Sequence, residues 1–137
     1  MKNRIIIAAA AFVPILGLTP SPYAKNYELK DGTPDDIVQW YRHAYRSDYG
    51  TPERPASCCG EADAYWADGV EIKDGKVFAI ITDDRQIAGR SDIPVGTRIK
   101  VWPQIMDKWH QGNPTGHTII FIASGGSVIC YFPDTGI

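Results

Sequence analysis

The stretch Ser57-Cys58-Cys59-Gly60-Glu61-Ala62-Asp63-Ala64-Tyr65-Trp66 contains two of the three cysteines of this 137-residue chain. The third, Cys130, lies in an apolar segment near the C-terminus. Adjacent cysteines bridge each other only in a strained geometry, so we expect Cys130 to pair with Cys58 or Cys59. We favour Cys59 slightly, because Gly60 after it gives the backbone freedom to approach a sheet.

A bridge from this stretch to Cys130 would fold the C-terminal segment back onto it. Closing a loop of about 70 residues stabilises a fold by roughly 4 kcal/mol in the chain-entropy model. That is a large share of the roughly 5–15 kcal/mol available to a small domain. We therefore expect the cysteines to be mainly structural, with one thiol left over.

The first 24 residues have the layout of a secretory signal peptide. Lys2 and Arg4 precede an apolar run at residues 5–18, and small and polar residues follow. The run is shorter than the roughly 20 residues that a membrane-spanning helix needs. We expect a signal peptide at residues 1–24 and a single disulfide-stapled domain at residues 25–137. This mature form would be periplasmic or secreted and not membrane-embedded.

The charge of the mature chain argues against some partners. Lys2 and Arg4 are two of the 14 basic residues, so 12 remain against 16 acidic residues and the net charge is −4. A nucleic-acid partner would require a basic patch, so we expect none. The chain has no nucleotide-binding glycine motif, and we expect no cofactor. The partner stays unknown, with a cell-envelope ligand or a protein as the candidates.

A helix start is indicated at Thr33-Pro34-Asp35-Asp36, where a capping residue, a first-turn proline and two acids follow each other. Apolar and aromatic residues then recur at helical spacing, which predicts a helix to about Ser47 that packs one face on a sheet. From Ser47 to Pro55 the glycine and prolines predict an irregular loop.

The rest of the chain reads as strands. Asp74-Gly75 between residues 70–73 and 76–81 predicts a two-residue hairpin with one apolar face. A long loop at residues 82–92, of a length unusual unless mobile or functional, precedes a half-buried strand at residues 97–102. The final hairpin, residues 117–123 and 128–132, is apolar on both faces and should be the centre of the sheet.

The expected fold class is therefore α+β, with an N-terminal helix packed on a small, mainly antiparallel sheet of about five strands. The curl of such a sheet could close it into a partly open β-barrel. If Gly125-Gly126 forms the final turn, Phe121 lies opposite Cys130. The same register places His117 opposite Asp134.

A catalytic hypothesis follows from this register. The unpaired member of Cys58 and Cys59 would be the nucleophile, His117 the base, and Asp134 or Asp63 the residue that orients it. The layout resembles cysteine peptidases of the bacterial cell wall, in which a histidine begins an apolar strand. The polar residues after Cys59 depart from the buried catalytic helix of those enzymes.

A metal site is a further alternative, with ligands from Cys58, Cys59, Glu61, Asp63 and His117. Zinc sites usually space their cysteines two to four residues apart, and adjacent cysteines reach one ion badly, so we expect no metal. The carboxylates and aromatics of the same stretch are candidate binding residues: Glu61, Asp63, Tyr65 and Trp66.

Four motifs together carry a closer resemblance: Ser57 to Asp63, Ile93-Pro94-Val95-Gly96-Thr97, Gly112 to His117, and Cys130-Tyr131. Their combination resembles a group of small exported bacterial proteins of uncharacterised function. Many of these carry another cysteine where this chain has Ala64. The resemblance implies export and a disulfide-stapled domain. We expect a binding or structural module of the periplasm or cell surface rather than an enzyme, with a cysteine hydrolase and a metal-binding protein as alternatives.

Overall fold

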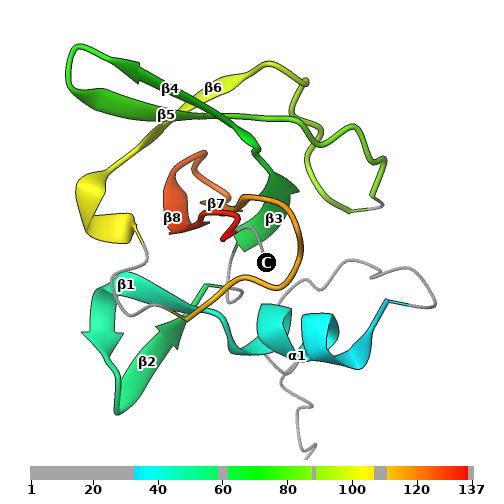
Figure 1. The fold of residues 1–137 in the computed structure, drawn as a ribbon, viewed down its shortest axis with the longest axis vertical. Coiled ribbons are helices and arrows are strands. Elements are labelled where there is room, and N and C mark those ends of the chain that lie inside the picture. The colour runs from blue at the N-terminus through cyan, green and yellow to red at the C-terminus, as the bar shows by residue number, and fades with distance from the viewer. Residues whose placement is uncertain (1–32, 59–61, 88, 107–110, 136–137) are drawn as a thin grey trace, which may run out of the picture.

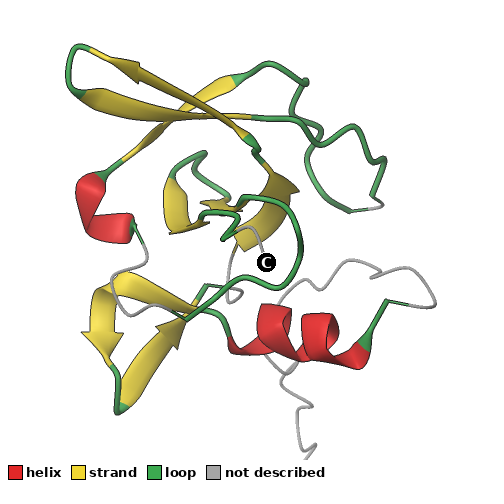
Figure 2. Ribbon diagram, viewed as in Figure 1, coloured by secondary structure: helices red, strands yellow, loops and turns green. Residues whose placement is uncertain are grey.

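The computed structural model describes residues 33–58, 62–87, 89–106 and 111–135 (Figure 1). These residues form an α+β fold in which one short α-helix accompanies small antiparallel sheets (Figure 2). Its elements are α1 (Asp35–His43), β1 (Tyr45–Thr51), β2 (Arg54–Ser57), β3 (Ala62–Trp66), β4 (Gly69–Lys73), β5 (Lys76–Ile80), β6 (Arg98–Val101), the 3₁₀ helix η1 (Pro103–Ile105), β7 (Ile119–Ala123) and β8 (Val128–Phe132). No helix in the described ranges has the length and apolar character needed to cross a membrane.

The strands form three open sheets, ordered β1-β2, β3-β7-β8 and β4-β5-β6. A barrel requires each strand to pair on both sides. Among the described residues β3 and β8 end the central sheet, and β8 adds only one isolated bridge, between Tyr131 and Met106. The partly open barrel is therefore not supported among the described strands. The α+β class and the mainly antiparallel pairing are confirmed.

The sheet β3-β7-β8 is the centre of the fold, as predicted. Its strand β7 alternates between two apolar clusters, one containing Ile119 and Phe121 and the other Ile120 and Ile122. The first cluster includes Tyr41 of α1, and the second includes residues of β5, β6 and η1. The central sheet is thus covered on both faces, by the helix on one side and by the second sheet on the other.

The register of the last hairpin is confirmed at its centre, where Phe121 lies opposite Cys130. Nearer the turn the register shifts, and Ile122 pairs with Val128. Ala123 N–H donates to Ser127 C=O at 2.9 Å, so the turn contains three residues rather than Gly125-Gly126 alone. Its last residue, Gly126, has a φ of 80° that suits glycine.

The helix ends at His43, earlier than predicted. The prediction of an irregular loop from Ser47 to Pro55 was also wrong. Ala44 adopts extended angles, and residues 45–57 form the β1–β2 hairpin. Two contacts from distant parts of the chain hold this extended backbone. The Gln111 side-chain amide donates to Tyr45 C=O and accepts from Tyr45 N–H, and Cys58 N–H donates to Ala44 C=O. The predicted helical face does pack on the sheet, because Tyr41 is buried against Phe121.

The β4–β5 hairpin has the predicted two-residue turn, with positive φ at both Asp74 and Gly75. Its expected apolar face is only half buried. Ala79 is fully buried, whereas Val70 and Ile72 on β4 are 51% and 73% exposed. Strand β3 was not among the predicted strands, the first of which was expected at residues 70–73.

The disulfide joins Cys58 to Cys130, with their Cα atoms 5.9 Å apart. The slight preference for Cys59 was therefore wrong. Cys58 directly follows β2, and both bridged cysteines are buried in the cluster between α1 and the central sheet. Cys59 lies outside the described residues. The bridge itself, between this stretch and Cys130, is confirmed.

Candidate functional site

The structure gives His117 a different partner from the one expected. His117 Nδ1 lies 2.9 Å from Asp68 Oδ2, while Asp134 N–H donates to Thr118 Oγ1 at 3.1 Å. Asp68 was missed because its place beside His117 depends on pairing between β3 and β7, and β3 was not predicted. The imidazole is thus oriented by Asp68 rather than by Asp134 or Asp63.

Asp68 is held by three further contacts. Its carboxylate accepts the Thr118 N–H at 2.7 Å and the Thr82 hydroxyl at 3.0 Å, and its own N–H donates to Thr82 Oγ1. Partial burial alone would raise the pKa of Asp68, but hydrogen bonds from His117, Thr118 and Thr82 outweigh it and lower the pKa. The result is an ionised carboxylate at the surface beside a histidine whose side chain is about one-third exposed.

Trp66, a predicted binding residue, is not an open platform. The His117 ring stacks on it at 3.8 Å with an interplanar angle of 12°, and the Arg85 guanidinium also lies 3.8 Å from the ring centre. Two groups this close to one indole cannot share a face, because they would overlap. They therefore cover its two faces, and neither is available to stack on a ligand.

Tyr65, another predicted binding residue, is part of the core. It is 2% exposed, its hydroxyl donates to Ser91 C=O at 2.8 Å, and the Arg90 guanidinium lies 4.4 Å from its ring centre. Burial raises the pKa of Tyr65 to about 12. Its role is to anchor the loop that follows β5.

A cluster of charged side chains fixes the loop that follows β5. The Asp83 carboxylate is fully buried and pairs with Arg85 at 2.6 Å and with Arg90 at 2.7 Å. It also accepts Trp66 N–H, and Arg90 donates to Ala64 C=O. Burial would raise the pKa of Asp83, but its hydrogen bonds from the two arginines hold it well below the usual range.

The structure does not bring together those remaining predicted site residues that it describes. Cys58 is oxidised, so it is neither a nucleophile nor a thiolate ligand. Asp63 lies in β3 opposite Ile122, and Cys59 and Glu61 fall outside the described residues. Within the described ranges, no three His, Cys, Asp or Glu residues are grouped so that they could hold a metal ion.

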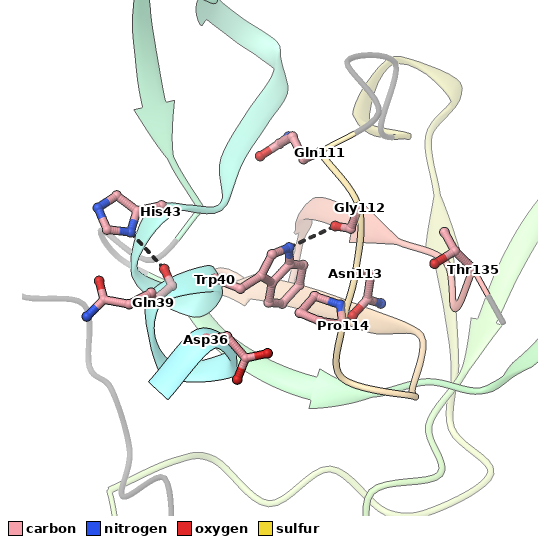
Figure 3. A pocket seen from close by; sticks show the side chains of 9 residues that line it. All are labelled: Asp36, Gln39, Trp40, His43, Gln111, Gly112, Asn113, Pro114 and Thr135. Carbon is pink, nitrogen blue, oxygen red and sulfur yellow. Dashed lines mark hydrogen bonds between the residues drawn. The ribbon is translucent and has the colours of Figure 1, made fainter. Parts of the chain in front are cut away.

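An open pocket of about 490 Å³ lies between α1 and the segment 111–114 (Figure 3). Trp40 and Pro114 form its apolar wall, and the Trp40 indole N–H donates to Gly112 C=O at 2.8 Å, which ties the helix to the segment. A second hollow of about 200 Å³ adjoins it, sharing Trp40, His43 and Gln111.

Some polar groups of this pocket are occupied by the fold itself. Both ends of the Gln111 amide bond the backbone of Tyr45. The buried Asn113 amide nitrogen donates to the C=O groups of His117, Phe132 and Pro133, and its oxygen accepts from Thr115. These bonds fix both side chains in the wall of the pocket.

Other polar groups line the pocket from exposed positions: Asp36, Gln39, His43 and Thr135. His43 Nδ1 lies 2.8 Å from Gln39 C=O, which can only accept, so Nδ1 carries a proton and Nε2 is the acceptor of the neutral ring. The sequence did not predict this pocket, because the aromatic residues of the helix were expected only to pack on a sheet.

Comparison of the chain with protein-family models, curated protein sequences and solved structures gave no significant match. The resemblance to small exported bacterial proteins therefore stays a prediction.

Proposed function

We propose that this chain is a small exported binding module of the periplasm or cell surface, and that the pocket between α1 and segment 111–114 is its ligand site. The pocket volume supports this, because about 490 Å³ falls within the roughly 300–1,000 Å³ of small-molecule sites. Export is supported by the signal-peptide layout of residues 1–24 and by the disulfide, which forms in oxidising compartments.

The lining favours a small polar ligand with one apolar face. The Trp40 indole and the Pro114 ring give a flat apolar wall. A carboxylate, an amide, an imidazole acceptor and a hydroxyl at Asp36, Gln39, His43 and Thr135 can then fix its orientation. A sugar or amino sugar of the cell envelope has this combination of an apolar ring face and hydrogen-bonding rim.

The wall of the pocket is pre-formed, which supports binding without a costly rearrangement. Trp40 packs edge-on against Tyr41 and Phe132, with ring centres 5.1 Å apart in both pairs. Asn113 fixes the opposite segment through its bonds to three backbone carbonyls. Both sides therefore belong to the rigid core around the central sheet.

The cysteine hydrolase alternative has less support. The hypothesis needs a thiolate beside His117, but Cys58 is in the disulfide and His117 stacks on Trp66 against Asp68. The metal alternative needs Cys58 or neighbours of it as ligands, and a bridged sulfur does not serve as one. No described contact favours either function over binding.

Titration of ¹⁵N-labelled protein with N-acetylglucosamine and with released peptidoglycan fragments tests the proposal. We expect shifts of the Trp40 indole N–H and of the amides in segment 111–113. The variant Gln39→Ala, at an exposed lining position, should weaken binding by about 3- to 10-fold, consistent with one lost hydrogen bond. Tyr49→Ala, 67% exposed on β1, is the matched control and should bind like the wild type.

Shifts confined to other surfaces, or equal weakening in both variants, would place the ligand elsewhere. An unchanged spectrum with both probes would remove the support for a cell-envelope sugar as the ligand.

A further inference from the structure

Strand β4 is an edge strand with exposed apolar side chains. Among the described strands it pairs only with β5, and Val70 and Ile72 on it are 51% and 73% exposed. In Figure 1 the tip of the β4–β5 hairpin extends away from the other sheets. Edge strands are usually protected by short length, charged side chains, proline or a bulge. β4 is short and carries Glu71 and Lys73, but these charges alternate with Val70 and Ile72 and so lie on the opposite face from them.

The register of the hairpin shows which backbone groups of β4 are unpaired within it. Lys73 lies opposite Lys76 and closes the two-residue turn, so Lys73, Glu71 and Gly69 direct their N–H and C=O groups to β5. Two backbone bonds just after β5 follow the same alternation. Ile81 N–H donates to Thr97 C=O on the β6 side, and Thr82 N–H donates to Trp66 C=O on the β4 side. Val70 and Ile72 therefore direct their N–H and C=O groups outward.

We propose that β4 pairs with β4 of a second copy of this chain in an antiparallel register that places Val70 opposite Ile72 of the other copy. This register uses both outward-facing residues of each strand and forms four backbone hydrogen bonds, two in each Val70–Ile72 pair. Shifting the register by one pairing position would place Val70 opposite Asp74, or Ile72 opposite Asp68, of the other copy. Neither of these aspartates belongs to the strand, because Asp74 lies in the turn and Asp68 precedes β4.

The side chains of the two copies fit each other in this register. On one face of the paired strands, the exposed side chains of Val70 and Ile72 in each copy pack against Val70 and Ile72 of the other copy. On the opposite face, Glu71 lies opposite Glu71 of the second copy, with Lys73 of that copy as its diagonal neighbour. Repulsion between the two carboxylates is reduced because each Glu71 already pairs with Arg98 of its own chain at 2.6 Å.

The association is expected to be weak. A five-residue strand contributes far less than the roughly 1,000 Å² of a stable interface. The contact through β4 does not include the ligand pocket beside α1, so this pairing does not depend on the proposed ligand binding.

Sedimentation velocity of the disulfide-bonded chain over a range of concentrations up to about 1 mM tests the pairing. We expect a concentration-dependent dimer that is weakened at least about tenfold by Ile72→Lys, which places like charges at the pairing edge. The matched control is Tyr49→Lys on β1, of similar exposure, which should keep the dimer. Arg98→Ala should weaken the dimer by a smaller factor, because it uncovers the Glu71 charge.

The register is tested by cross-linking in a Cys59→Ser background. Oxidised Glu71→Cys should form an intermolecular disulfide, because this residue sits on the two-fold axis in a non-hydrogen-bonded pair. Adding Ile72→Lys should abolish the cross-link.

A chain that stays monomeric at about 1 mM, or a dimer that Ile72→Lys and Tyr49→Lys weaken equally, would overturn the proposal. Cross-linking through Ile72→Cys in preference to Glu71→Cys would overturn the register. An extended segment of another protein found on β4 of the purified monomer would overturn the choice of occupant.

Discussion

Two aspartates adjoin Trp66, and the fold places them in opposite environments. Asp83 is fully buried between Arg85 and Arg90, whereas the Asp68 side chain is 38% exposed and pairs with His117. Both accept backbone N–H groups, from Trp66 and Thr118 respectively. The difference shows that the same side chain can fix a loop in the interior or orient a surface imidazole, depending on whether water can replace its partners.

The largest expected effect follows from removal of the buried carboxylate. Asp83→Ala leaves the Arg90 guanidinium, 3% exposed, without a counter-ion, and breaking a buried pair from one side costs about 3–5 kcal/mol. Asp68→Ala should cost less, about 1–2 kcal/mol, because two of its three partners, His117 and Thr82, are partly exposed to water. Urea unfolding of each variant measures the free energy of unfolding.

Asp84→Ala is the matched control for this first prediction. Asp84 is exposed and directly follows Asp83 in the chain, so its removal should change stability by no more than about 0.5 kcal/mol. A loss below about 1 kcal/mol in Asp83→Ala would mean that the buried ion cluster contributes little to the fold.

Acid should lower the free energy of unfolding more through Asp83 than through Asp68, by less than the substitutions do. The pKa of each aspartate is lower in the folded chain than its ordinary value of 3.8. The stability that each contributes is therefore present above about pH 4 and is lost as the pH falls toward the folded pKa. Because the pKa of Asp83 is lowered further, most of this acid-dependent loss should come from Asp83.

Unfolding free energies of the wild type and of Asp68→Asn at pH 6, 4, 3 and 2 distinguish the two contributions. We expect Asp68→Asn to retain most of the acid-dependent loss. If the variant instead became nearly independent of pH in this range, Asp68 rather than Asp83 would be the main acid-sensitive group.

The elements predicted correctly are those that local sequence specifies. The β4–β5 turn follows from Asp74-Gly75, two residues that tolerate positive φ, and the central hairpin follows from its two apolar faces. The β1–β2 hairpin was missed because Gly50 and the prolines argued against strands. In the structure Gly50 has a φ of 87° in an irregular register, and a side chain there would meet Arg54 C=O.

The two aspartate clusters could not be predicted for different reasons. Asp68 and His117 are 49 residues apart and meet only because β3 pairs with β7. Asp83, Arg85 and Arg90 are close in sequence, but a run of charges in a long segment also fits an exposed loop. Their burial depends on Tyr65 and Trp66 lying beneath the two guanidinium groups, which no local pattern indicates.

The smallest expected effect concerns the bond between Asp68 and His117. A side-chain contact in which both partners are about one-third exposed should contribute about 0.2–1 kcal/mol, because water competes for both groups and the side chains lose freedom on pairing. A double-mutant cycle of Asp68→Ala and His117→Ala isolates this coupling, since the Asp68 bonds to Thr118 and Thr82 are lost equally in both arms. His43→Ala paired with Asp68→Ala is the control cycle and should show no coupling, because the His43 ring bonds its own helix at Gln39. A coupling above about 2 kcal/mol for Asp68 and His117 would mean that the surface pair behaves like the buried pairs of Asp83, and that exposure alone does not separate the two regions.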